Sequence, residues 1–306
     1  MAKTHLGPSK PFALFHSFWV SVRPKTLSAS VSPVLLAFAL SGPSPSFALF
    51  LPTVLCALFM QMGANLANDY YDRAKGVDRH RLGPMRPVQL GKLSPDRLKA
   101  FFLLSFALAF FLGLTLVWVK GLGLLVLGVL CLLAAYLYTG GPYPLSHHMM
   151  GEVAAFIFFG PVAILGALWI FQGFFDVHDF FLSLPSGFMA ALMMGLNNQR
   201  DALSDRRAEK YTPASLWGEE WGRRLNLFFL SWTFLLPFLF CWALGLGPSM
   251  FLPLLPFALF MPRWRRLLKG AKERELIPIL EASGRYFFLY NLSLALGVVL
   301  SRAGGY

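Results

Sequence analysis

Long runs of apolar residues dominate the chain, and charged residues are confined to the segments between them. Seven stretches contain no Asp, Glu, Lys or Arg, namely 26–68, 100–119, 121–151, 153–175, 180–199, 225–262 and 286–301. Several of them reach the length of about 20 apolar residues that a helix needs to cross a bilayer. This pattern predicts a polytopic membrane protein.

Two of these stretches, the first and the sixth, are too long for one crossing. Each contains a cluster of helix-breaking residues, Ser-Gly-Pro-Ser-Pro-Ser over 41–46 and Gly-Leu-Gly-Pro-Ser over 245–249. Pro24 is expected to kink the first helix or to restart it. The fold class that follows is an all-α membrane protein, a nine-helix bundle forming one domain over residues 1–306. The nine expected spans are 18–40, 47–69, 99–119, 121–139, 151–172, 180–199, 225–244, 248–262 and 284–301.

Composition excludes a soluble globular enzyme. Charged residues make up 14% of the chain and hydrophobic residues 56%, whereas soluble domains carry roughly 25% charged residues. Cys56, Cys131 and Cys241 all fall inside expected spans, which predicts unpaired core thiols. No apolar stretch followed by a small-residue cleavage site precedes the first span, so no removable signal peptide is expected.

The basic residues predict the orientation in the membrane. Almost all of the 27 Lys and Arg residues lie in 1–25, 70–99, 200–224 and 263–285. With nine spans and an internal N-terminus these segments share one side, which the positive-inside rule makes cytoplasmic, and the C-terminus lies outside. The net charge of +12 is then explained by topology and by contact with anionic lipids. Nucleic-acid binding is not expected, and the setting predicted is the cytoplasmic (inner) membrane of a bacterium.

Most of the 15 acidic residues belong to two cytoplasmic segments, each of which begins at the end of a span. Within each segment the polar side chains recur at i,i+3 or i,i+4, so a helix would direct them to one side. The side chains that carry oxygen ligands are Asn65, Asn68, Asp69 and Asp72 in the first segment and Asn197, Asn198, Asp201 and Asp205 in the second.

Two opposed carboxylate faces suit Mg²⁺, which proteins hold with one or two carboxylates together with substrate phosphate oxygens. Basic residues interleaved with the carboxylates would bind the remaining phosphate charge. These bases are Arg73, Lys75, Arg200, Arg206 and Lys210. One such segment alone is equally well explained as a solvated loop with helix-capping Asp residues. Because two similar segments occur at the ends of two spans, a site for a metal-bound diphosphate is favoured, and an internal duplication is suggested.

Other polar residues near the spans leave two interpretations open. His147 and His148 either line the site or are incidental at the membrane interface. Glu152 either stabilises a helix N-terminus through the helix dipole or is functional, as ionisable groups at span edges often are.

The motifs resemble the UbiA superfamily of intramembrane aromatic prenyltransferases. They are Asn-Asp-x-x-Asp-x-x-Lys-Gly-x-Asp over 68–78, Arg-Leu-Gly-Pro-Met-Arg over 81–86 and Asn-x-Arg-Asp-x-x-x-Asp-Arg over 198–206. Within it the chain looks most like MenA-type 1,4-dihydroxy-2-naphthoate polyprenyltransferases, which Arg-Pro-Lys-Thr-Leu over 23–27 and Gly-Pro-Tyr-Pro-Leu over 141–145 also fit. The 4-hydroxybenzoate branch usually has Lys-Arg after its Tyr-Pro. Here Tyr143-Pro is followed by Leu-Ser-His-His, which favours the naphthoate branch.

The resemblance implies a central cavity open to the cytoplasmic side and to lipid, and an Mg²⁺-dependent transfer of a polyprenyl group from polyprenyl diphosphate to a naphthoate with loss of CO₂. The product would be demethylmenaquinone, in menaquinone biosynthesis. The implied catalytic residues are Asp69, Asp72, Asp201, Asp205 and Asn68, and the implied metal ligands are the four aspartates with Asn65 and Asn197. The five interleaved bases would bind diphosphate, and the acceptor would be bound by Arg23, Lys25 and Asn198.

Several alternatives remain open at this point. The general base is unassigned between Asp69, Asp201 and a bound water, and the acceptor could instead be 4-hydroxybenzoate, homogentisate or another naphthoate. A secondary transporter is the rival from another class, but transporter sites usually lie near the bilayer midplane, whereas these carboxylates cluster at one surface. Prenyl chain length and oligomeric state do not follow from the sequence.

Overall fold

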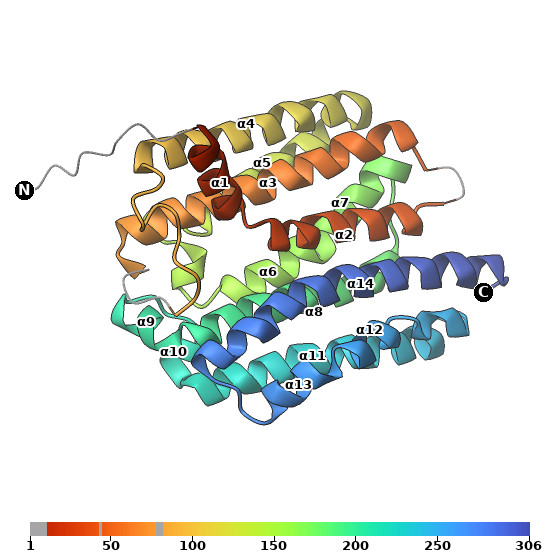
Figure 1. Ribbon diagram of the computed structural model, residues 1–306. Helices are drawn as coiled ribbons and strands as arrows, with labels where there is room; N and C mark the ends of the chain where they lie inside the picture. The colour runs from red at the N-terminus through yellow and green to blue at the C-terminus, as the bar shows by residue number, and fades with distance from the viewer. Residues whose placement is uncertain (1–10, 43–44, 78–81) are drawn as a thin grey trace, which may run out of the picture.

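The computed structural model describes residues 11–42, 45–77 and 82–306, and over these residues the chain is a bundle of helices without any named strand (Figure 1). Asp78 and Arg81, which belong to the sequence motifs, lie outside the described residues. The all-helical membrane fold expected from the hydropathy pattern is confirmed.

The helices follow one another with short connections. In the first half they are α1 (Pro11–Val22), α2 (Pro24–Leu40), α3 (Phe47–Ala74), α4 (Pro95–Lys120), α5 (Leu122–Leu137), the 3₁₀ turn η2 (Leu145–His147), α6 (Gly151–Phe159) and α7 (Pro161–Gln172). In the second half they are α8 (Val177–Arg200), α9 (Ala202–Arg207), α10 (Pro213–Trp217), α11 (Glu219–Ala243), η3 (Pro248–Phe251), α12 (Leu254–Leu259), α13 (Met261–Leu268), η4 (Glu273–Glu275) and α14 (Leu276–Ala303).

Six helical segments of the described chain are long and apolar enough to cross a bilayer, which indicates an integral membrane protein. They are α3, α4, α6 with α7, α8, α11, and η4 with α14. Three shorter apolar helical segments, α2, α5 and η3 with α12, occupy the remaining expected spans. The eighth expected span, 248–262, is divided among η3, α12 and the start of α13.

Two of the expected spans, the first and the fifth, are broken directly before a proline. Arg23 adopts a left-handed backbone with φ 58° between α1 and α2, and Pro24 begins α2. The expected restart of the helix at Pro24 is therefore confirmed. The helix breaks at Arg23 because proline disfavours helical geometry in the residue before it. The break between α6 and α7 falls at Gly160 and Pro161, where the backbone of Gly160 lies so close to Gly187 of α8 that a Cβ would clash.

Helix packing brings the charged segments together at one end of the bundle. α3 packs along α4, while α8 packs against α6, α11 and α14. In Figure 1 the end of α3, helices α9 and α10, and the connection from α13 to α14 lie at the left, and the end of α2, the start of α3 and the C-terminus lie at the right. The three cysteines are unpaired, as expected.

Candidate active site

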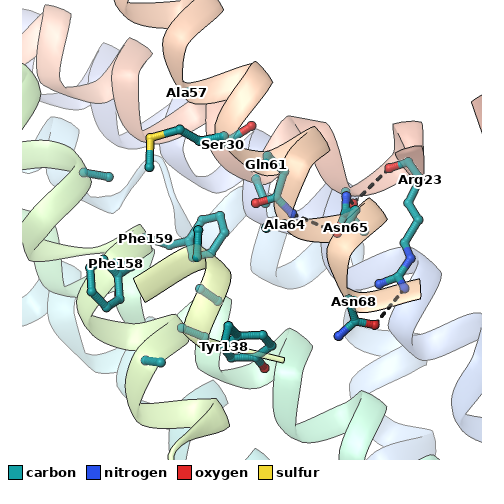
Figure 2. A pocket seen from close by; sticks show the side chains of 18 of the residues that line it. Arg23, Ser30, Ala57, Gln61, Ala64, Asn65, Asn68, Tyr138, Phe158 and Phe159 are labelled. Carbon is teal, nitrogen blue, oxygen red and sulfur yellow. Dashed lines mark hydrogen bonds between the residues drawn. The ribbon is translucent and has the colours of Figure 1, made fainter. Parts of the chain in front are cut away.

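A cavity of about 890 Å³ extends from the charged end of the bundle into its apolar interior. Its charged end is lined by both acidic segments, and its interior by apolar side chains of α3 to α7 such as Val117, Leu127 and Phe158. Figure 2 shows Tyr138, Phe158 and Phe159 on the opposite side of this space from the polar side chains of α3. The cavity therefore joins a charged compartment to an apolar one.

The first acidic segment forms the last turns of α3. Because α3 continues to Ala74, Asp69 and Asp72 are three residues apart on one helix face. Both carboxylates are buried and line the cavity. Asp69 is paired with Arg23 and, at 2.7 Å, with Nη1 of Arg86, while Oδ2 of Asp72 lies 3.3 Å from Nη2 of Arg86.

The second acidic segment begins where α8 ends. Asp201 follows the last residue of α8, and Asp205 belongs to the short helix α9. Arg200 is paired with Asp201, and its Nε donates a hydrogen bond of 2.9 Å to Oδ1 of that carboxylate. Oδ2 of Asp205 lies 3.2 Å from Nζ of Lys210.

Asp205 and Lys210 perturb each other's protonation. Burial raises the pKa of the Asp205 carboxyl to about 6, and the neighbouring Asp201 adds to this rise while Lys210 opposes it. Burial alone would lower the pKa of Lys210, but the carboxylates of Asp205, Asp72 and Asp201 outweigh it and raise that pKa. Lys210 therefore stays protonated at neutral pH and interacts electrostatically with both acidic segments.

The four aspartates thus face four bases, and their charges balance. The bases in contact with them are Arg23, Arg86, Arg200 and Lys210. Every one of these eight side chains lines the cavity. Because burying unpaired charge is expensive, this pairing offsets the cost of placing the carboxylates near an apolar space.

The donor set fits a hard divalent cation. Four carboxylates from two segments line one cavity, and oxygen ligands of this kind are those that Mg²⁺ prefers. Oδ1 of Asp72 is buried and accepts no hydrogen bond from the described residues, so it is available as a ligand. Over the part of the chain that is described, no three His, Cys, Asp or Glu side chains already converge on one point. The carboxylates would have to exchange their basic partners for a metal.

The asparagines of the two segments have different surroundings. Asn65 accepts a hydrogen bond from Gln61 at 3.2 Å (Figure 2). It also donates to the Val22 carbonyl at 2.8 Å, so it holds the break between α1 and α2. Asn68 accepts a hydrogen bond from Arg23 at 3.1 Å, and Asn197 accepts one from Arg200 at 2.7 Å. All three asparagines line the cavity.

Other residues expected at the site lie outside the cavity lining. Arg73, Lys75 and Arg206 are exposed, and Lys75 instead donates to the Thr139 carbonyl at 3.2 Å. Asn198 is buried behind the cavity, where it donates to Glu152 at 2.9 Å. These four side chains were expected to lie with the aspartates in the cavity lining, but the structure does not bring them there.

The acceptor candidates Arg23 and Lys25 both line the cavity, but they differ in exposure and partner. Arg23 is paired with Asp69, whereas Lys25 forms an exposed ion pair of 2.9 Å with Glu281. Arg23 therefore lies nearer to the acidic segments than Lys25 does.

Two residues near the aspartates were not assigned from sequence. Arg86 belongs to the motif over 81–86, but nothing in the sequence distinguishes it from the topology-setting bases around it. His147 is buried with Nε2 at 3.8 Å from Oδ1 of Asp72. Only the fold shows that Arg86, in the connection after α3, and His147, in the connection after α5, both lie next to Asp72.

Comparison with known proteins identifies the fold and the family. The UbiA prenyltransferase family is matched over residues 30–292. The chain belongs to the UbiA prenyltransferase family. Membership in this family supports a prenyltransferase and disfavours the transporter interpretation. The resemblance drawn from the sequence motifs is thereby confirmed.

Relatives within the family match almost the whole chain. The 1,4-dihydroxy-2-naphthoate octaprenyltransferase of Mycobacterium tuberculosis is 31% identical, with 90% of this chain and 95% of that protein covered. The Escherichia coli protein of the same name is 30% identical, with 92% and 94% covered. A UbiA homolog from Archaeoglobus fulgidus bound to GPP and Mg²⁺ has the same fold, with a TM-score of 0.62, 17% identity, and 92% of this chain and 99% of that chain covered.

Proposed function

We propose that this protein transfers a polyprenyl group from polyprenyl diphosphate to 1,4-dihydroxy-2-naphthoate, with loss of CO₂, to give demethylmenaquinol, the reduced form of demethylmenaquinone, in menaquinone biosynthesis. Family membership supports the reaction class, and the names of the relatives from M. tuberculosis and E. coli support the acceptor. The metal proposed is Mg²⁺, which is bound in the A. fulgidus homolog.

One observation carries the proposal, namely that two acidic segments line the charged end of a cavity whose interior is apolar. A polyprenyl diphosphate has the matching division, because its tail is hydrocarbon and its head is a charged diphosphate. The apolar interior, which includes Leu124, Leu127 and Phe159, suits the tail. The charged end suits the head.

The bases at the charged end are proposed to bind the diphosphate. Arg86, Arg200 and Lys210 line the cavity beside the aspartates, so each can move from a carboxylate to a phosphate oxygen over a short distance. Arg73, Lys75 and Arg206 are assigned at most a long-range electrostatic role, because they are exposed away from the cavity. Guanidinium groups bind phosphate oxygens in bidentate fashion, which fixes the head group.

Asp69, Asp72, Asp201 and Asp205 are the proposed metal ligands, with Asn68 and Asn197 positioned to orient them. When bound, Mg²⁺ would withdraw negative charge from the departing diphosphate. The allylic C–O bond breaks and its electron pair leaves with the diphosphate. The apolar walls of the cavity then keep water away from the allylic cation.

The ring carbon that carries the carboxylate is the proposed nucleophile. It forms the new C–C bond, and CO₂ departs and returns its electron pair to the ring, so no proton has to be removed from that carbon. Arg23 and Lys25 are proposed to hold the acceptor carboxylate at the charged end. Asn198 is proposed to act from behind the cavity, by fixing Glu152.

The proposed setting is the cytoplasmic membrane of a bacterium, crossed nine times by a single domain over residues 1–306. The concentration of basic segments at one end supports a cytoplasmic location for that end. The cavity would then open to the cytoplasm and sideways to lipid. Residue 1 would lie inside the cell and residue 306 outside.

Mass spectrometry of the products tests this function. Purified protein is given Mg²⁺, geranylgeranyl diphosphate and, separately, 1,4-dihydroxy-2-naphthoate, 4-hydroxybenzoate and homogentisate. A prenylated product that has lost 44 mass units, formed only from the naphthoate, is expected from the mass of CO₂. Product from another acceptor alone would assign a different substrate, and no product from any acceptor would contradict the proposed activity.

A further inference from the structure

The connection between α5 and α6, residues 138–150, lies between the two acidic segments and contacts both. It contains the 3₁₀ turn η2 and the buried side chain of His147. None of its residues is an expected metal ligand. Its contacts nevertheless determine how the two acidic segments are held relative to each other.

On one side this connection is anchored to the end of α3. Nζ of Lys75 donates to the Thr139 carbonyl at 3.2 Å, and the hydroxyls of Tyr71 and Tyr136 are 3.0 Å apart at the end of α5. Both anchors come from residues within three positions of Asp72 in the sequence. The end of α3 and the start of the connection are therefore held together.

On the other side the connection is hydrogen-bonded to the segment that follows α9. The Tyr211 amide donates to the His147 carbonyl at 3.1 Å, and the Met149 amide donates to the Tyr211 carbonyl at 2.9 Å. Tyr211 directly follows Lys210, whose Nζ lies 3.2 Å from Asp205. The His147 carbonyl is thus hydrogen-bonded to the residue that directly follows Lys210, the base that pairs with Asp205.

The ring of His147 is directed to the first acidic segment. Its Nε2 lies 3.8 Å from Oδ1 of Asp72, which is too long for a hydrogen bond. Both atoms are buried, and neither has a hydrogen-bond partner in the described part of the protein. Buried polar atoms normally have a hydrogen-bond partner. A small shift of either side chain would bring Nε2 of His147 and Oδ1 of Asp72 within hydrogen-bond distance of each other.

We propose that His147 is a positioning residue, whose ring orients the Asp72 carboxylate for metal binding while its carbonyl ties that carboxylate to the Lys210–Asp205 pair. Partners that hydrogen-bond a ligating carboxylate from behind fix its orientation and contribute to metal affinity. The proposal rests on the proposed function, because it assumes that Asp72 binds the metal.

Metal binding gives a test that does not depend on turnover. Full-length protein in detergent is mixed with geranylgeranyl thiolodiphosphate, an analogue that resists cleavage, and is titrated with Mn²⁺ while the EPR signal of free Mn²⁺ is measured. The variants are His147→Ala, which removes the ring, and His147→Gln, which restores an N–H donor of similar reach. His148→Ala is the matched control, because His148 is the next residue and its side chain is exposed.

We expect His147→Ala to raise the Kd for Mn²⁺ about tenfold. His147→Gln should recover most of the loss, and His148→Ala should leave the Kd within about twofold of the original protein. Thermal unfolding without metal is measured in parallel. Equal Kd values for His147→Ala and His148→Ala would overturn the proposal, and so would a His147→Gln variant that regains thermal stability but not affinity.

The same titration separates this proposal from the function on which it rests. If the unaltered protein binds no Mn²⁺ with the analogue present, the proposed metal site itself is wrong. If the unaltered protein binds Mn²⁺ and His147→Ala binds it equally well, only the role of His147 is wrong.

Discussion

Arg86 is the base that contacts both carboxylates of the first acidic segment, and its removal should destabilise the protein through those carboxylates. Its guanidinium lies 2.7 Å from Asp69 and 3.3 Å from Asp72, and all three side chains are buried. In Arg86→Met the apolar stem is replaced but the charge is lost. Asp69 keeps Arg23, whereas Asp72 keeps no Lys or Arg within ion-pair distance among the described residues.

The size of the effect follows from that unpaired carboxylate. Removing one partner of a buried ion pair costs about 3–5 kcal/mol, because the other charge is left uncompensated. For a large domain each kcal/mol corresponds to about 2–4 °C in Tm. We therefore expect Arg86→Met to lower the unfolding midpoint of the detergent-solubilised protein by roughly 6–20 °C. Arg86→Lys should lose less, since an ammonium keeps the charge but cannot bridge two carboxylates.

A double-mutant cycle isolates the cause. If the unpaired charge of Asp72 is responsible, adding Asp72→Asn to Arg86→Met should restore at least half of the lost Tm, although each single change is destabilising. Midpoints are measured by following intrinsic tryptophan fluorescence during heating without metal. Losses that simply add in the double variant would refute the reasoning, because additivity means that the two side chains do not interact.

Three further predictions concern activity and orientation. Asp69→Asn and Asp201→Asn should each lower kcat by about 10²-fold or more, the scale of one strong electrostatic stabiliser. EDTA should abolish turnover. Full activity of either variant, or in EDTA, would contradict the proposed metal site. Arg23→Lys should raise the KM for the naphthoate about tenfold, for the loss of a bidentate pair, with little change for prenyl diphosphate; the reverse pattern would assign Arg23 to the diphosphate. In a cysteine-free background, an impermeant thiol reagent outside intact cells should label Ser46→Cys but not Arg207→Cys, and the opposite labelling would invert the topology.

Hydropathy was sufficient to place most of the helices, but not the ends that matter for function. The second span was expected to end at residue 69, near the first charged side chain, whereas α3 continues to Ala74; the sixth was expected to end at residue 199, and α8 ends at Arg200, in agreement. A span placed by hydropathy ends where the first carboxylate occurs, because charged residues are expected outside the apolar part of the bilayer. The side chains of Asp69 and Asp72 are buried on α3 and are paired with Arg86, 14 residues beyond Asp72. A hydropathy window along the sequence does not detect a partner at that distance.

Helix geometry explains which bases were assigned incorrectly. Arg73 directly follows Asp72 on α3, and Arg206 directly follows Asp205 on α9. Adjacent residues on a helix point about 100° apart and do not share a face. If the aspartates face the cavity, these two arginines must point away from it, as they do. The same spacing argument could have separated Arg73 and Arg206 from the aspartates, but it would also have excluded Arg200, which directly precedes Asp201 and lines the cavity.

The bases that do contact the aspartates come largely from outside the two acidic helices, and this has a consequence for binding. Arg23 is the single residue between α1 and α2, and Arg86 lies in the connection between α3 and α4, so neither belongs to a helix. Arg200, in contrast, is fixed at the end of α8. Exchange of the first segment's carboxylates from bases to metal therefore involves bases that lie outside the packed helices. The first acidic segment, which depends on two such bases, should be the more easily rearranged of the two when metal and diphosphate bind.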